Sequence, residues 1–179
     1  MEEIKTFINE FLKAEATASD AFVKPDLADY NNKLAHMNSF CVKELQNKFG
    51  MMPLLQLRSD DFYKEWKDYG SRNPRHIYKI SHYKNETYGD VYVVYISQKN
   101  PDNVIFVYET CLFVTMINNE LKIVKYYTFG DGMRIKDKFE TAQGIEDISF
   151  KILKKPIEIE RYREPEDDDD AMEHYLMDL

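Results

Sequence analysis

The hydrophobic positions near the start of the chain recur at the spacing of an α-helix. Within residues 3–18 the apolar side chains lie three or four residues apart: Ile4, Phe7, Ile8, Phe11 and Leu12. A helix with that spacing is apolar on one side and polar on the other, so the pattern predicts an amphipathic helix. A second stripe from Leu27 to Phe49, after Pro25 and before Gly50, predicts another helix of about six turns.

A third and shorter helix is expected after Ser59, whose hydroxyl can cap a helix N-terminus. It would carry Phe62, Trp66 and Tyr69 and would end at Gly70. Beyond Pro74 the apolar period changes to two, and β-branched and aromatic residues dominate, which is typical of strands. The candidate strands are residues 76–84, 88–98, 104–117 and 121–129, and residues 148–153 could add another.

The Asn118-Asn119 pair predicts a tight hairpin between the last two of these four strands, because asparagine tolerates the positive φ of a two-residue turn. This turn fixes a pairing register in which Ile117 faces Glu120. The more apolar face, expected to cover the helices, pairs Met116 with Leu121, Val114 with Ile123, Leu112 with Lys125, and Thr110 with Tyr127. The opposite face pairs Thr115 with Lys122, Phe113 with Val124, and Cys111 with Tyr126. Helices followed by an antiparallel meander predict an α+β fold.

The length of 179 residues favours one domain with one sizeable core. No apolar run reaches the roughly 20 residues of a membrane-spanning helix, and the chain starts with an acidic, amphipathic segment, so a cytoplasmic protein without a membrane partner is expected. The two cysteines, Cys41 and Cys111, fit reduced core thiols better than a disulfide framework.

The net charge of -8 is concentrated at one end of the chain. Residues 157–179 hold ten acidic and two basic side chains, whereas residues 1–156 hold 22 of each sign. This division predicts a neutral α+β domain over residues 1–156 and an acidic extension over residues 157–179, which ends in a short helix from Met172 to Leu179. Nucleic acid is not an expected partner, because phosphate neutralisation needs a basic patch. A charged partner would be basic, although an acidic run can also be a solvating tail.

The sequence contains no concentrated set of catalytic or metal-ligating residues. Phosphate-binding glycine loops, nucleophile elbows and paired cysteines are absent, and the four histidines are spread along the chain. Neither a metal site nor a cofactor is therefore expected. Glu109, flanked by tyrosines, is the best candidate for a buried catalytic acid of the isomerase kind, but no acid or base partner can be named beside it.

Helices followed by a meander whose last hairpin reads INNELKIVKYYTF, from Ile117 to Phe129, resemble the NTF2-like (cystatin-like, cone-shaped) superfamily. The resemblance covers residues 1 to about 130, and it implies N-terminal helices packed on a curved antiparallel sheet. Within that superfamily the chain looks most like the bacterial immunity proteins of polymorphic toxin systems. Those proteins lack catalytic residues and neutralise a cognate toxin by binding it.

The leading interpretation is a non-enzymatic, cytoplasmic immunity protein that binds a cognate toxin with a basic surface. An alternative is a small-molecule-binding or isomerase-like enzyme that uses a cone pocket. A third interpretation is a scaffold subunit that dimerises through an exposed sheet face. The residues expected to bind the partner are Glu158, Glu160, Glu164, Glu166, Asp167, Asp168, Asp169, Asp170 and Tyr126.

Overall fold

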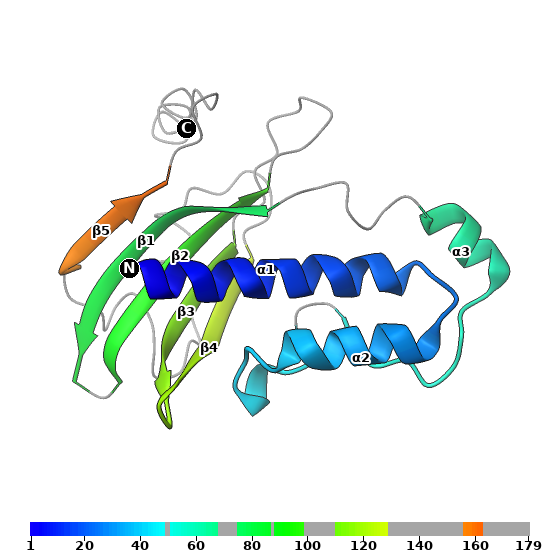
Figure 1. Cartoon of the computed structure of the whole chain (residues 1–179), viewed down its shortest axis with the longest axis horizontal. Helices are drawn as coiled ribbons and strands as arrows, with labels where there is room; N and C mark the ends of the chain where they lie inside the picture. The colour runs from blue at the N-terminus through cyan, green and yellow to red at the C-terminus, as the bar shows by residue number, and fades with distance from the viewer. Residues whose placement is uncertain (49–50, 68–74, 87, 99–109, 129–155, 163–179) are drawn as a thin grey trace.

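A computed structural model describes residues 1–48, 51–67, 75–86, 88–98, 110–128 and 156–162 of the chain. Three α-helices and a short 3-10 helix come first, and strands follow (Figure 1). The helical elements are α1 (Glu2–Phe22), α2 (Leu27–Asn38), η1 (Lys43–Leu45) and α3 (Asp60–Trp66). The strands are β1 (Arg75–Asn85), β2 (Gly89–Gln98), β3 (Thr110–Ile117), β4 (Glu120–Thr128) and β5 (Glu158–Arg161).

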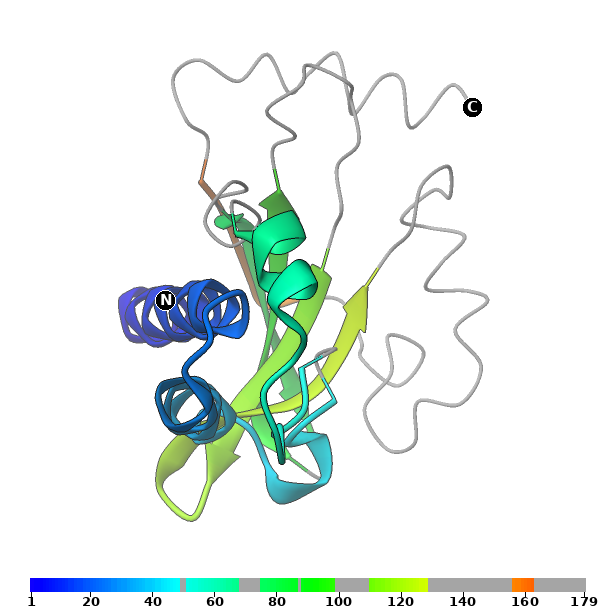
Figure 2. The same ribbon diagram turned by 90° about the vertical axis from the view of Figure 1, so that its right-hand side faces the viewer.

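The strands form one antiparallel sheet in the order β4-β3-β2-β1-β5. The sheet is curved, and α1 and α2 lie on one of its faces (Figure 2). The predicted α+β class with N-terminal helices on a curved antiparallel sheet is therefore confirmed. Because β5 pairs with β1, the acidic extension predicted from residue 157 begins inside this sheet.

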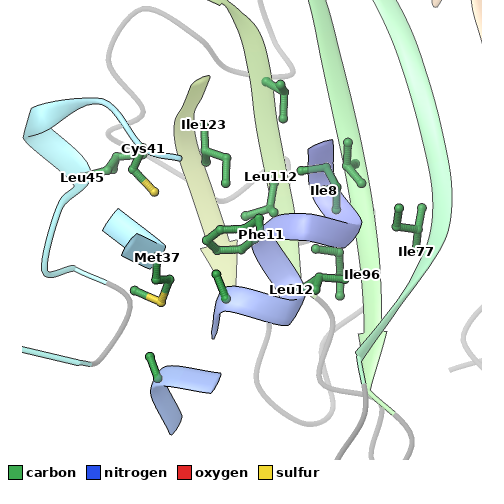
Figure 3. Close-up of a cluster of buried hydrophobic side chains, with 14 of the residues drawn as sticks. Ile8, Phe11, Leu12, Met37, Cys41, Leu45, Ile77, Ile96, Leu112 and Ile123 are labelled. Carbon is green, nitrogen blue, oxygen red and sulfur yellow. The ribbon is translucent and has the colours of Figure 1, made fainter. Parts of the chain in front are cut away.

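The main core lies between the helices and the sheet (Figure 3). Ile8 and Phe11 of α1 are fully buried there, together with Leu112 of β3 and Ile123 of β4. These helix residues belong to the predicted apolar stripe. A second buried cluster, on the opposite side of the sheet, contains Tyr83, Val91, Val93, Tyr95, Cys111 and Phe113. The middle strands are therefore buried on both faces.

The predicted long helix from Leu27 to Phe49 is wrong in its second half, since α2 ends at Asn38. The chain then runs beside β4, where the N–H of Ile123 donates to Phe40 O at 2.9 Å and the N–H of Val42 donates to Ile123 O at 3.0 Å. The apolar residues beyond this point, Cys41 and Leu45, are still buried. Their burial explains why the spacing resembled a helix, although sheet-type pairing replaces the helical hydrogen bonds here.

The Asn118-Asn119 hairpin is confirmed, with φ values of 51° and 66°. The predicted register holds from Ile117–Glu120 to Val114–Ile123, and then an irregularity between Phe113 and Val114 shifts it by one residue. Beyond that shift the observed pairs are Phe113 with Lys125, Leu112 with Tyr126, Cys111 with Tyr127, and Thr110 with Thr128, in place of those predicted. A bulge of this kind turns the side chains after it to the other face, so Tyr126 packs against the helix-side core.

The third predicted helix is confirmed as α3, and the Ser59 hydroxyl accepts a hydrogen bond from the N–H of Phe62 at 3.3 Å. Several expectations lie outside the described residues: the end of that helix near Gly70, strand residues 104–109, the run 148–153 and the helix from Met172. Across the ranges that the structure describes, no helix is long and apolar enough to cross a membrane.

Candidate partner-binding site

Two of the predicted binding residues, Glu158 and Glu160, lie on β5. In the β1–β5 pairing Glu158 is opposite His82 and Glu160 is opposite Ile80. Ile80 belongs to the core beneath the helices, so both carboxylates are on the helix side of the sheet. Ile159, between them, points to the other face and is 51% exposed.

The first turn of α1 brings two more carboxylates to the same place. Glu2 and Glu3 are exposed there, and the Lys5 ammonium lies 4.4 Å from the ring centroid of Tyr162, directly after β5. We call Glu2, Glu3, Glu158 and Glu160 the acidic surface. Sequence reasoning missed Glu2 and Glu3, because only the pairing of β5 with β1 reveals that two segments so far apart in sequence are neighbours.

Carboxylates of both α1 and β5 raise the pKa values of two tyrosines, Tyr162 and Tyr92. Burial raises the pKa of Tyr162, and the nearby charges of Glu160, Glu2 and Glu158 raise it further. Burial also raises the pKa of Tyr92, where Asp90, Glu3 and Glu158 add to the effect. Carboxylates from α1 and from β5 therefore lie close enough to disfavour the phenolate of the same residue.

Asp90 lies near this region, but its charge is already compensated. The Asp90 Oδ1 is 2.8 Å from His82 Nε2 and 2.9 Å from Lys84 Nζ. Hydrogen bonds from Lys84 and then His82 hold the Asp90 pKa below its ordinary value. The His82 ring also stacks on Tyr92 with centroids 4.6 Å apart. By contrast, no ion pair with a basic side chain of the described ranges involves any carboxylate of the acidic surface.

Tyr126, which was also predicted to bind the partner, lies away from the acidic surface. It lies on β4, at the end of the strand order opposite to β5. Its hydroxyl donates to Lys48 O, and its ring packs against the helix-side core. The bulge in β4 places this side chain on the same face as Leu112, whereas the predicted register placed it on the face of Cys111. The other predicted binding residues, Glu164, Glu166 and Asp167 to Asp170, lie outside the described residues, as does Glu109.

A separate charged pair lies inside the molecule, between α1 and the start of β1. Glu15 accepts from the Arg75 guanidinium at 2.6 Å, and Arg75 also donates to the Thr110 hydroxyl at the start of β3. The guanidinium therefore joins α1 to β1 and β3.

Burial raises the pKa of Cys41 to about 12, and the negative charge of Glu15 raises it further. Within the parts of the chain that the structure describes, no group of three or more His, Cys, Asp or Glu residues could hold a metal ion.

A comparison with known proteins found no match: no family model fits the sequence, and neither a curated protein nor a solved structure matches the chain.

Proposed function

We propose that this protein is an immunity protein that binds and neutralises a cognate toxin through direct contact. The observation that carries the proposal is the acidic surface, in which carboxylates from α1 and β5 gather without basic partners among the described residues. The order of helices followed by a meander that ends in the hairpin from Ile117 to Phe129 also supports it, because this pattern resembles the NTF2-like superfamily, which includes bacterial immunity proteins.

The chemistry of the acidic surface fits a basic partner. A toxin cleft that holds phosphates is positively charged, so a cluster of carboxylates can occupy it and imitate the charge of the substrate. Opposite potentials also accelerate association, to about 10⁸ M⁻¹s⁻¹ or more at low salt, which suits an inhibitor that must act quickly.

Exposed apolar side chains also lie on or directly before β5, and Ile159 points to the face opposite the carboxylates. Ile157 is 62% exposed and Ile159 is 51% exposed, at the end of the sheet formed by β5. Burying them against a partner would add stabilisation of about 25 cal/mol per Å² of apolar surface removed from water. A partner would contact both the carboxylates and Ile159 only if it covered both faces of the sheet at β5.

Co-expression with the product of the adjacent upstream gene tests the proposal. We expect the protein to copurify with that product and to protect the cells that produce it. The variant Glu158→Gln/Glu160→Gln should weaken both effects. The matched control Glu44→Gln/Glu65→Gln also removes two carboxylates, from η1 and α3, which lie far from β5 in Figure 1, and should leave both effects unchanged. No complex and no protection would contradict the proposal.

A further inference from the structure

β5 forms one end of the sheet, and no described segment pairs with its outer edge. In the strand order β4-β3-β2-β1-β5, β1 is the strand that pairs with β5. The other end of the sheet is partly covered, because Phe40 and Val42 form backbone hydrogen bonds with Ile123 of β4. Figure 1 shows β5 at the left-hand end of the sheet, with no other described element beyond it. An edge of this kind presents N–H and C=O groups that can pair with another strand.

The backbone of β5 is held in the conformation that such pairing needs. All four residues of β5 pair with β1 in one register, with Glu158 opposite His82 and Arg161 opposite Lys79. Directly before the strand, the N–H of Ile157 donates to His82 O at 2.7 Å. The inner edge of β5 is therefore fixed to β1, and a strand added at the outer edge would meet an extended backbone that is already in place.

The two faces of β5 differ in chemistry. Glu158 and Glu160 lie on the helix side, where they belong to the acidic surface. Ile159 and Arg161 point to the opposite face, because successive side chains of a strand alternate. Arg161 is opposite Lys79 there, so that face carries an exposed isoleucine beside basic groups. A strand added at this edge would therefore meet carboxylates on one face of the sheet and apolar and basic side chains on the other.

These charges decide which strand fits the edge. A second copy of β5 does not fit, because antiparallel pairing centred on Ile159 would bring Glu158 against Glu160 of the other copy, and like charges directly opposite each other are destabilising. A strand with cations at alternate positions places all of them on the helix side, opposite the carboxylates. Its apolar side chains then lie beside Ile159. A uniformly basic segment would instead bring cations against Arg161.

We propose that the outer edge of β5 binds an extended segment in which basic and apolar residues alternate, and that the toxin supplies this segment. The toxin as the source depends on the proposed immunity function, whereas the fit of the segment to the edge does not. A strand paired at the edge reaches both faces of the sheet, so it contacts the carboxylates and Ile159 together. In this mode of recognition, backbone hydrogen bonds provide affinity and alternate side chains provide specificity.

A short synthetic peptide of alternating lysine and valine is the probe. Added to the isotope-labelled full chain, it should shift the NMR amide signals of Glu158–Arg161. A peptide of the same composition, with its lysines in one block and its valines in another, should bind more weakly because its charges do not lie on one face. The alternating peptide with every backbone nitrogen methylated keeps its charges but cannot donate hydrogen bonds, so it should also bind more weakly.

Variants on the two faces of β5 distinguish pairing at the edge from binding to one face. Glu158→Gln removes a charge from the helix side, and Ile159→Thr removes an apolar contact from the opposite face while keeping a β-branched side chain. Each should raise the dissociation constant of the alternating peptide by about two- to fivefold. The matched controls are Glu65→Gln, at another exposed glutamate, and Leu57→Thr, at a side chain that is 50% exposed compared with 51% for Ile159. Both should leave the dissociation constant unchanged.

Unchanged amide signals of β5, or equal binding of the alternating, block and methylated peptides, would overturn the proposal. An effect of Glu158→Gln without an effect of Ile159→Thr would also overturn it, because a ligand lying on one face would behave in that way. Peptide binding at β5 without a complex between this protein and the upstream gene product would contradict the immunity function, and with it the toxin as the source of the segment.

Discussion

At the scale of single residues, the contact between Glu15 and Arg75 illustrates how a buried charge depends on its partner. The two side chains are 14% and 19% exposed, so water compensates little of either charge. Removing one partner leaves the other charge buried and unpaired, which is far more destabilising than the loss of an exposed ion pair. The pair therefore joins α1 to the sheet only while both members are present.

Glu15→Ala should lower the free energy of unfolding by about 3 kcal/mol, because it leaves the Arg75 guanidinium without its carboxylate. Urea denaturation measures this change. Lys33→Ala breaks the more exposed pair with Asp29 on α2 and should cost less than about 0.5 kcal/mol. Equal losses in the two variants would contradict the assigned role of the buried pair.

Asp90 gives a prediction about pH. Its pKa is lowered in the folded state, so the ionised carboxylate stabilises the fold. That contribution is fully present above the ordinary carboxyl pKa and is lost as the pH falls through the lowered value. Carbon NMR should show Asp90 titrating below a typical aspartate. Lys84→Met should raise its pKa toward the ordinary value, and Lys64→Met, on α3, should not change it. An Asp90 pKa unaffected by Lys84→Met would contradict the assigned cause.

At the scale of elements, local patterns determine what lies close in sequence. The apolar stripe of α1, the Ser59 cap and the Asn118-Asn119 turn each depend on a few neighbouring residues, and the structure confirms all three. The end of α2 and the bulge in β4 could not be predicted in this way. Both depend on pairing between distant segments: Phe40 and Val42 bond to Ile123, and the register shift occurs where β3 meets β4.

The hairpin between β3 and β4 predicts a specific effect of a branched side chain. Asn119 has a φ of 66°, a left-handed conformation that β-branched residues adopt poorly. Asn119→Val should therefore lower the free energy of unfolding by about 1–2 kcal/mol, and Asn119→Gly should be tolerated. Thermal or urea denaturation measures both variants. A valine variant as stable as the glycine variant would show that the turn conformation does not constrain this position.

At the scale of the whole molecule, the fold brings acidic residues from opposite ends of the described chain to one place. The charge distribution in the sequence predicted Glu158 and Glu160 as binding residues, because the final residues carry all of the net charge. It could not predict their neighbours Glu2 and Glu3, which reach them only through the packing of α1 on the sheet beside β1 and β5. The predicted register placed Tyr126 on the wrong face of the sheet, because one bulge reverses the direction of its side chain.

The most direct test of the proposed binding surface is the association rate constant with the product of the adjacent upstream gene, measured by stopped flow at low and high salt. The carboxylates of the acidic surface attract a basic partner. Glu158→Gln/Glu160→Gln should therefore slow association about tenfold at low salt and weaken the salt dependence of the rate constant. Glu44→Gln/Glu65→Gln should match the unmodified protein. Equal rates and equal salt dependence for all three proteins would contradict the claim that the acidic surface receives a basic toxin.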